Sequence, residues 1–239
     1  ATPEYDGVAN YAYHLDAGKF APFLQRHCCG KLGVRHVLAD VREVRLHENG
    51  DIRAIDTEQA GEIAGDLFID CTGFRSLLLG DAMGVGFRDC SDILFCDTAL
   101  AVQMPYPDAQ SPIATHTIST AQSAGWIWDI GLPTRRGIGH VYSSRHQSQD
   151  AAERELRAYL GPGGADLPIR KIAIRSGHRE TFWKRNCVAV GVAAGFLEPL
   201  EASAIVLIEL SAKMIAEQLP ACREVMDVIA SRFNETTHY

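Results

Sequence analysis

Apolar residues recur at helical spacing in some stretches of the chain and alternate with polar residues in others. Helical spacing predicts an amphipathic helix over 13–32, a charged amphipathic helix over 150–160 and a polar helix over 223–233. Short apolar or alternating runs predict strands over 34–37, 41–46, 52–56, 65–73, 98–104, 113–119, 125–130, 137–143, 169–174 and 187–190.

Turn residues and helix spacing indicate how these strands are joined. Asn49-Gly50 stands between two alternating runs, which is a strong signal for a β-hairpin. The four strands predicted between 98 and 143 have no helix between them, so they are expected to pair antiparallel. The fold class is therefore predicted to be α+β.

The stretch 187–210, CVAVGVAAGFLEPLEASAIVLIEL, is the one around which the chain is organised. It predicts a buried strand, a tight glycine loop and a helix over 202–219. That helix is apolar on nearly every face, which is typical of a buried helix. A helix start of this kind directs free N–H groups and the positive end of the helix dipole at the loop, where anions and cofactor edges bind.

Composition excludes several classes of function. The 239 residues carry a net charge of −7 without a Lys/Arg cluster, which argues against nucleic-acid binding. No apolar run approaches membrane-spanning length, and no signal peptide is recognisable. The seven cysteines form no Cys-x-x-Cys pair, which favours reduced thiols in the cytoplasm over disulfides or a zinc site.

The histidines likewise lack metal-ligand spacing, so no metal is predicted. His14, His116 and His140 are expected to be polar residues with ordinary hydrogen bonds. The dinucleotide fingerprint G-x-G-x-x-G does not occur in the chain. Because a nucleotide-binding domain normally opens with it, the sequence is expected to be truncated at its start, and the polar last helix suggests the same at its end.

Three motifs together carry a family resemblance. DLFIDCTGFRS at 66–76, WIWDI at 126–130 and GFLEPLE at 195–201 resemble the flavin-dependent tryptophan halogenases, and YHLD at 13–16 and GHVYSS at 139–144 agree. The resemblance implies an aromatic-hydroxylase-like flavoprotein fold, with a partial FAD-binding α/β layer and an antiparallel sheet on the substrate side. It further implies one composite domain, truncated at both ends, that would lack the FAD fingerprint, the family's catalytic lysine and the C-terminal helices. Its expected regions are a partial FAD-binding region, 1–80, a substrate-side sheet, 81–175, and a returning FAD- and halide-binding segment, 176–239.

The resemblance also implies a reaction. Reduced FAD, supplied by diffusion from a separate flavin reductase, would react with oxygen and with chloride or bromide to give hypohalous acid. The oxidant would halogenate tryptophan or a related small aromatic substrate. A homodimer is left open.

Residue roles are carried over by position. Glu201 maps to the catalytic glutamate, and Ser203 and Ala204 map to the residues that contact halide. Trp126, Trp128 and Ile130 would separate substrate from flavin. Contacts to FAD are expected from Thr72, Gly73, Gly191, Ala194, Gly195 and Phe196.

This sequence departs from the family pattern at two positions. Gly131 stands where the W-x-W-x-I-P motif has proline, and Ala202 stands where serine is common. Structural interpretations also stay open. Glu198 and Glu201 could simply offset a helix dipole, and the tryptophans could be core residues. Likewise Asp70, Thr72 and Gly73 could form a turn.

Two alternative functions stay open. An FAD-dependent aromatic hydroxylase would use the same architecture, and the replaced proline mildly favours it. A non-catalytic flavin-binding fragment is favoured by the missing fingerprint and lysine, and no turnover is expected from the chain as given.

Overall fold

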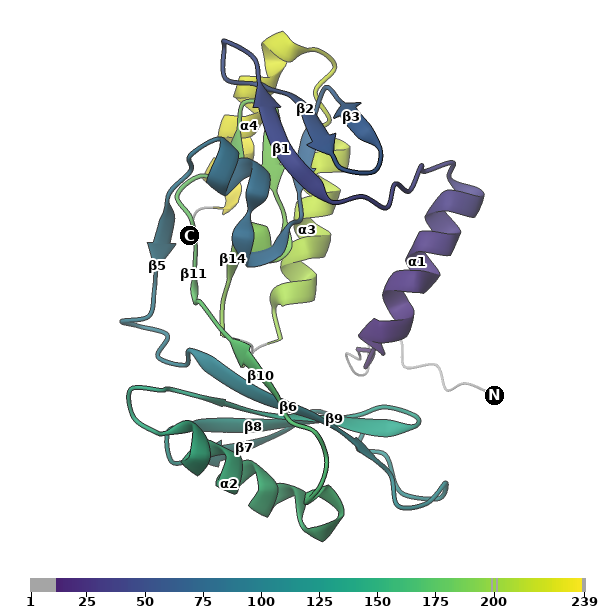
Figure 1. Cartoon of the computed structure of the whole chain (residues 1–239), viewed down its shortest axis with the longest axis vertical. Helices are drawn as coiled ribbons and strands as arrows, with labels where there is room; N and C mark the ends of the chain where they lie inside the picture. The colour runs from purple at the N-terminus through teal and green to yellow at the C-terminus, as the bar shows by residue number, and fades with distance from the viewer. Residues whose placement is uncertain (1–11, 199, 201, 238–239) are drawn as a thin grey trace, which may run out of the picture. The chain divides into compact units, whose positions relative to one another are not determined.

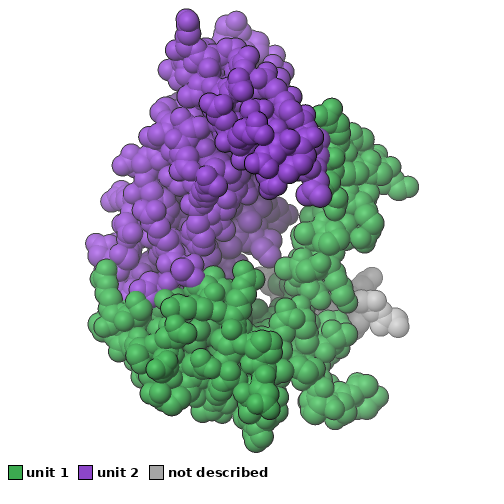
Figure 2. All heavy atoms as spheres, in the orientation of Figure 1, with its two compact units in different colours: residues 1–36, 98–172 green, residues 37–97, 173–239 purple. Residues whose placement is uncertain are grey.

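The computed structural model describes residues 12–198, 200 and 202–237 (Figure 1). The chain divides into two compact units, each built from two separate stretches (Figure 2). Unit 1 comprises residues 1–36 and 98–172, and unit 2 comprises 37–97 and 173–239. The predicted division into 1–80, 81–175 and 176–239 stays a prediction.

Unit 1 is organised around a five-stranded sheet with the order β10-β6-β9-β8-β7. The pairs β6–β9, β9–β8 and β8–β7 are antiparallel, as the absence of intervening helices predicts. The strands are β6 (Thr98–Pro105), β7 (Ile118–Gln122), β8 (Gly125–Gly131), β9 (Arg135–Tyr142) and β10 (Arg170–Ala173).

Helix α2 (Gln149–Leu160) covers one face of this sheet (Figure 1). The Ser148 side chain caps its start, accepting a hydrogen bond from the Ala151 N–H at 3.3 Å. Leu156 of α2 packs with Ile127 and Ile138 of the sheet, and all three are buried. The amphipathic pattern of 150–160 is thus confirmed, because its apolar face is the one that the sheet buries.

Helix α1 (Ala17–Lys31) follows a segment that is bonded to the end of the same sheet. His14 contacts the Gly131 carbonyl through Nδ1 at 3.0 Å, and Arg135 donates to the Asp16 carboxylate at 3.1 Å. The predicted helix is confirmed, but its apolar side chains Phe20 and Phe23 are exposed.

The described part of unit 2 contains three three-stranded sheets, with the orders β1-β2-β3, β14-β11-β5 and β12-β13-β4. The Asn49-Gly50 hairpin is confirmed, since β1 and β2 pair antiparallel on either side of it. Strands β13 and β4 pair parallel. The strands are β1 (Val41–Leu46), β2 (Ile52–Thr57), β3 (Gly61–Ala64), β4 (Phe68–Asp70), β5 (Phe87–Asp89), β11 (Gly177–Arg179), β12 (Trp183–Lys184), β13 (Cys187–Ala189) and β14 (Gly195–Phe196).

Two helices end the described part of unit 2, α3 (Ala204–Glu217) and α4 (Arg223–Thr237). Trp183 is almost fully buried between them and β13, with its ring against Phe233 at 5.5 Å. Asn234 of α4 accepts hydrogen bonds from the Phe182 and Trp183 N–H groups at 3.0 and 2.8 Å, so α4 is bonded directly to the β12 strand.

Three expectations from the sequence are wrong in detail. Residues 34–37 form no strand, because the run is short and has no partner to pair with. Strand β7 begins at Ile118, five residues later than expected for 113–119. The predicted burial of α3 also fails. Only Ile215 of that helix is buried, whereas Ile205 and Val206 are 59% and 54% exposed.

No helix in the described part of the chain is long and apolar enough to cross a membrane.

Candidate active site

A cavity of about 260 Å³ lies in unit 2, between β11, the loop after β13 and the first turns of α3. We call residues 191–195 the cavity loop. The walls are mainly apolar, and they bring together six of the residues that the sequence singles out: Gly191, Ala194, Gly195, Phe196, Ser203 and Ala204.

Two glycines shape the cavity loop for different reasons. Gly191 has a φ of +66°, a left-handed conformation that strains other residues. Gly195 pairs with His178, and a Cβ there would lie 2.7 Å from the Gly177 carbonyl oxygen. The loop can therefore turn tightly and approach β11 closely only with glycine at these two positions.

The start of α3 faces the cavity through Ser203 and Ala204. Ser203 occupies the N-cap position, yet its side chain accepts no hydrogen bond from the first turn. Ala202, just before it, has a φ of +51°, which is unusual for a residue with a Cβ. An uncapped helix start directs partial positive charge at the cavity, as the sequence pattern predicts.

Asp70 organises the turn that carries Thr72 and Gly73. Its buried carboxylate accepts hydrogen bonds from the Thr72 hydroxyl at 2.6 Å and from the Leu78 and Leu79 N–H groups at 3.0 and 2.8 Å. The interpretation of Asp70 as a structural residue of the turn is therefore confirmed.

The turn packs beside the cavity loop. The 3-10 helix η1 (Gly73–Arg75) contacts η4 (Gly191–Ala193), and the Phe74 and Phe196 rings lie 5.7 Å apart, edge to face. Thr72 and Gly73 do not line the cavity in the described part of the chain. Their contact with FAD stays a prediction.

Cys96 lies beside Glu198, a relationship that the sequence does not signal. Burial, followed by the negative charge of Glu198, raises the pKa of the Cys96 thiol to about 12. The thiol therefore stays protonated next to the Glu198 carboxylate. Glu201 lies outside the described residues, and its catalytic role stays a prediction.

Trp126 and Trp128 form a second cluster, in unit 1. Both project from one side of β8, and their rings meet edge to face with centroids 6.2 Å apart. They are half-buried, as is Ile130, whereas Ile127 of the same strand is fully buried. The common side that the i, i+2 spacing predicts is confirmed, and the separation of substrate from flavin stays a prediction.

Local packing explains why position 131 is a glycine. A Cβ on Gly131 would lie 2.8 Å from the Ile113 side chain and 3.1 Å from the Ala114 carbonyl oxygen. Its own carbonyl contacts His14. Proline therefore does not fit at position 131 without movement of the neighbouring chain.

Sequence reasoning missed a polar network on the opposite side of β8. Asp129 is buried and accepts hydrogen bonds from the Tyr159 hydroxyl at 3.0 Å and from Arg136 Nε at 3.1 Å. The Asp129 hydrogen bond, ahead of the opposing effect of burial, raises the pKa of Arg136. An aspartate inside an otherwise apolar strand was the available signal.

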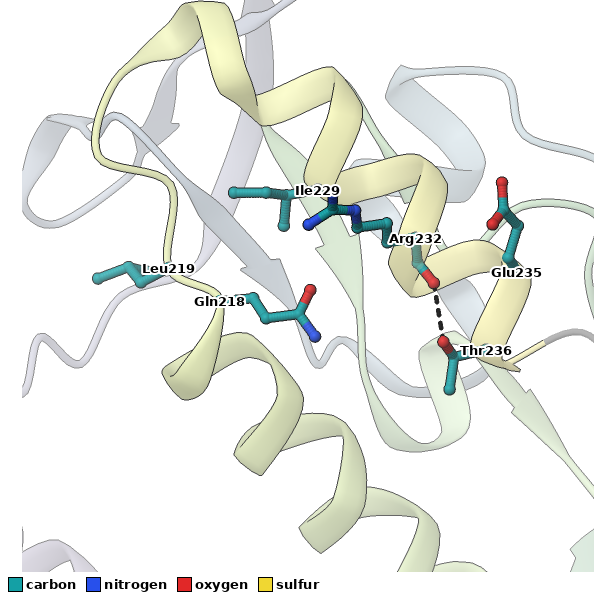
Figure 3. A pocket seen from close by; sticks show the side chains of 6 residues that line it. All are labelled: Gln218, Leu219, Ile229, Arg232, Glu235 and Thr236. Carbon is teal, nitrogen blue, oxygen red and sulfur yellow. Dashed lines mark hydrogen bonds between the residues drawn. The ribbon is translucent and has the colours of Figure 1, made fainter.

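A second hollow lies between the end of α3 and α4 (Figure 3). Its volume is about 460 Å³, and it is lined by Gln218, Leu219, Ile229, Arg232, Glu235 and Thr236. The Thr236 hydroxyl donates to the Arg232 carbonyl at 2.9 Å, so this side chain is engaged within α4 (Figure 3). The hollow contains none of the predicted site residues. Across residues 12–198, 200 and 202–237, no three His, Cys, Asp or Glu side chains are grouped to hold a metal.

Comparison with known proteins decides the family. The sequence profile described as "Tryptophan halogenase" matches residues 2–239. The chain belongs to the tryptophan halogenase family. The 7-chloro-L-tryptophan 6-halogenase KtzR of Kutzneria sp. (strain 744) is 44% identical over 211 residues, which are 88% of this chain and 41% of KtzR.

Solved structures of the tryptophan halogenase family agree with the fold. A tryptophan halogenase from Shewanella frigidimarina NCIMB 400 is 52% identical, with a TM-score of 0.90 over 93% of this chain and 43% of that one. BrvH, a flavin-dependent halogenase from Brevundimonas sp. BAL3, is 41% identical, with a TM-score of 0.87 over 94% and 45%. The predicted family and α+β fold are confirmed, and the chain spans about two fifths of the length of these relatives.

Proposed function

We propose that the protein is a flavin-dependent halogenase that acts on tryptophan or a related aromatic substrate with chloride or bromide. The observation that carries the proposal is the cavity at the start of α3. Six residues that were predicted to bind FAD or halide line this one cavity. Relatives named as tryptophan halogenases support the substrate class.

The cavity suits part of a flavin rather than a whole dinucleotide. Its volume of about 260 Å³ lies just below the range of roughly 300–1,000 Å³ typical of pockets for complete small molecules. The small residues of the cavity loop would allow a flat ring edge to approach the backbone. Bound reduced FAD would supply the chemistry that activates oxygen toward a halide.

The chain's own residues have separable roles in this proposal. Ser203 and Ala204 would present the positively polarised start of α3 to the halide. Glu201 would hold or remove a proton at the aromatic ring carbon that is substituted. Trp126 and Trp128 would form an aromatic wall at the substrate.

The supply and setting of the reaction belong to the same proposal. Reduced FAD would arrive by diffusion from a flavin reductase, and the compartment would be the cytoplasm. A homodimer is an additional expectation, which the mass of the protein in solution tests directly.

The test uses the longest natural form of the protein with reduced FAD, oxygen, bromide or chloride, and tryptophan. Product mass spectra should show a halogen isotope pattern, and that pattern should disappear with Glu201→Gln. Glu198→Gln is the matched control, because Glu198 lies beside Cys96 and not on the cavity wall. Retention of full activity by Glu201→Gln would remove Glu201 from the mechanism.

A hydroxylase is the second candidate, and it was favoured by the missing proline at position 131. The packing around Gly131 explains that substitution without a change of reaction. A product that gains one oxygen and no halogen would nevertheless establish the hydroxylase. A flavin-binding chain without turnover would show bound FAD and neither product.

A further inference from the structure

Arg179, on β11, is a buried arginine whose described partners are neutral. It is 8% exposed. Its Nη1 donates to the Val85 carbonyl at 3.1 Å and its Nε donates to the Ala193 carbonyl at 3.4 Å. The guanidinium also faces the Phe87 ring at 5.5 Å.

No carboxylate neutralises this charge in the part of the chain that the structure describes. None of the ion pairs formed there includes Arg179. Glu180, the next residue, is exposed. Because a buried charge is costly unless it is paired, and because charges act strongly in a low dielectric, the guanidinium must influence the electrostatic potential around it.

Both the backbone and the side chain of Arg179 are held in place. The Arg179 backbone N–H donates to the Ala194 carbonyl at 2.7 Å, which bonds β11 to the cavity loop. On the other side, a Cβ at Gly80 would lie 2.6 Å from the guanidinium carbon, so Gly80 leaves the space that the arginine fills. The charge therefore lies directly behind the cavity loop, whose residues Gly191, Ala194 and Gly195 line the cavity.

We propose that Arg179 is a positioning residue of the cavity, whose side chain holds the cavity loop through the Ala193 carbonyl and favours a negatively charged occupant. The proposal rests on the proposed function, because the anion is then supplied either by the ring of reduced flavin or by halide. Oxidised flavin, whose ring is neutral, is the natural reference for the charge effect.

The experiment measures three dissociation constants on the longest natural form of the protein: oxidised FAD, reduced FAD without oxygen, and bromide. Arg179→Met removes the charge. Arg179→Lys keeps the charge but loses the planar guanidinium and its several N–H donors. Arg175→Met is the matched control. Arg175 faces the same Phe87 ring at 4.0 Å, but its side chain is 57% exposed and contacts Asp89 at 3.8 Å.

In Arg179→Met, the preference for reduced over oxidised FAD, the affinity for bromide, or both should fall about tenfold, because the attraction of the buried charge for a nearby anion is lost. Loss of the FAD preference identifies the ring as the anion, and loss of bromide affinity identifies the halide. Arg179→Lys should keep the preference for reduced over oxidised FAD, because the positive charge remains. Any fall in affinity should be equal for both forms of FAD, because lysine holds the cavity loop less well whichever form binds.

Two results would overturn the proposal for Arg179. One is an unchanged FAD preference together with an unchanged bromide affinity in Arg179→Met. The other is an equal loss of FAD preference or bromide affinity in Arg175→Met. That result would show that any nearby positive charge has the same effect. Wild-type protein that binds neither FAD nor bromide would instead contradict the proposed function itself.

Discussion

Arg223 donates two hydrogen bonds to the carboxylate of Asp51, from Nε at 2.7 Å and from Nη2 at 2.9 Å. This paired contact joins the β1–β2 hairpin to the start of α4, 172 residues away in sequence. The Asp51 side chain is 9% exposed and the Arg223 side chain 35% exposed, so water screens the pair only in part.

The Asp51–Arg223 pair should make stability depend on pH. Hydrogen bonds from Arg223 lower the pKa of Asp51, against the opposing effect of burial. Because the folded-state pKa is depressed, the stabilisation is present above the unfolded value of about 3.9 and is lost as pH falls below it. Asp51→Asn should cost about 1–3 kcal/mol in urea unfolding near neutral pH, with the difference from wild type closing in acid.

Asp227→Asn is the control for this prediction. Asp227 also contacts Arg223, at 3.1 Å, but its side chain is 66% exposed. Its loss should cost less than about 0.5 kcal/mol. Equal costs for the two variants would show that the contact between hairpin and helix contributes nothing beyond surface charge.

Gly139→Ala should displace Trp128. A Cβ at Gly139 would lie 2.1 Å from the indole ring of Trp128, its cross-strand partner. We expect a loss of about 1–3 kcal/mol in the free energy of unfolding, together with a shift of tryptophan fluorescence. Gly137→Ala, two residues away on β9, meets only the end of Arg135 at 3.9 Å and should change neither. An unaltered emission spectrum in Gly139→Ala would show that the ring is not packed there.

Ala202→Gly should stabilise the protein, because Ala202 has a left-handed φ of +51° at which a Cβ is strained. Removing the strain is worth about 1 kcal/mol before the entropy cost of glycine in the unfolded chain is subtracted. Ala212→Gly, inside α3, should instead destabilise by roughly 0.5–1 kcal/mol. Thermal unfolding of both variants gives the comparison, and a loss of stability in both would contradict the strain at Ala202.

A polypeptide of these 239 residues, expressed alone, should self-associate. Helix α3 exposes Ile205, Val206 and Leu210 by 59%, 54% and 51%, an apolar surface of the kind that promotes aggregation. Replacing Ile205 and Val206 with lysine should increase the soluble, monodisperse fraction in light scattering. A wild-type chain that is monomeric and unfolds in one transition would contradict this expectation.

Local sequence determined much of the secondary structure. Asn49-Gly50 specified a hairpin because the turn needs a residue at positive φ, and Gly50 adopts a φ of +83° there without strain. The pattern of 150–160 specified an amphipathic helix because its apolar face had a matching sheet to cover. The motifs at 66–76, 126–130 and 195–201 identified the family because they depend on residue order alone.

The tertiary structure decided what lies next to what. The apolar composition of 202–219 predicted a buried helix, yet burial depends on neighbouring segments, and the described chain leaves most of α3 exposed. The grouping of Gly191 with Ser203, the carbonyl partners of Arg179 and the bond between Asp51 and Arg223 join residues that no local pattern relates. The sequence encodes which conformations each segment prefers, whereas long-range packing selects the partners of each buried charge and the shape of the cavity.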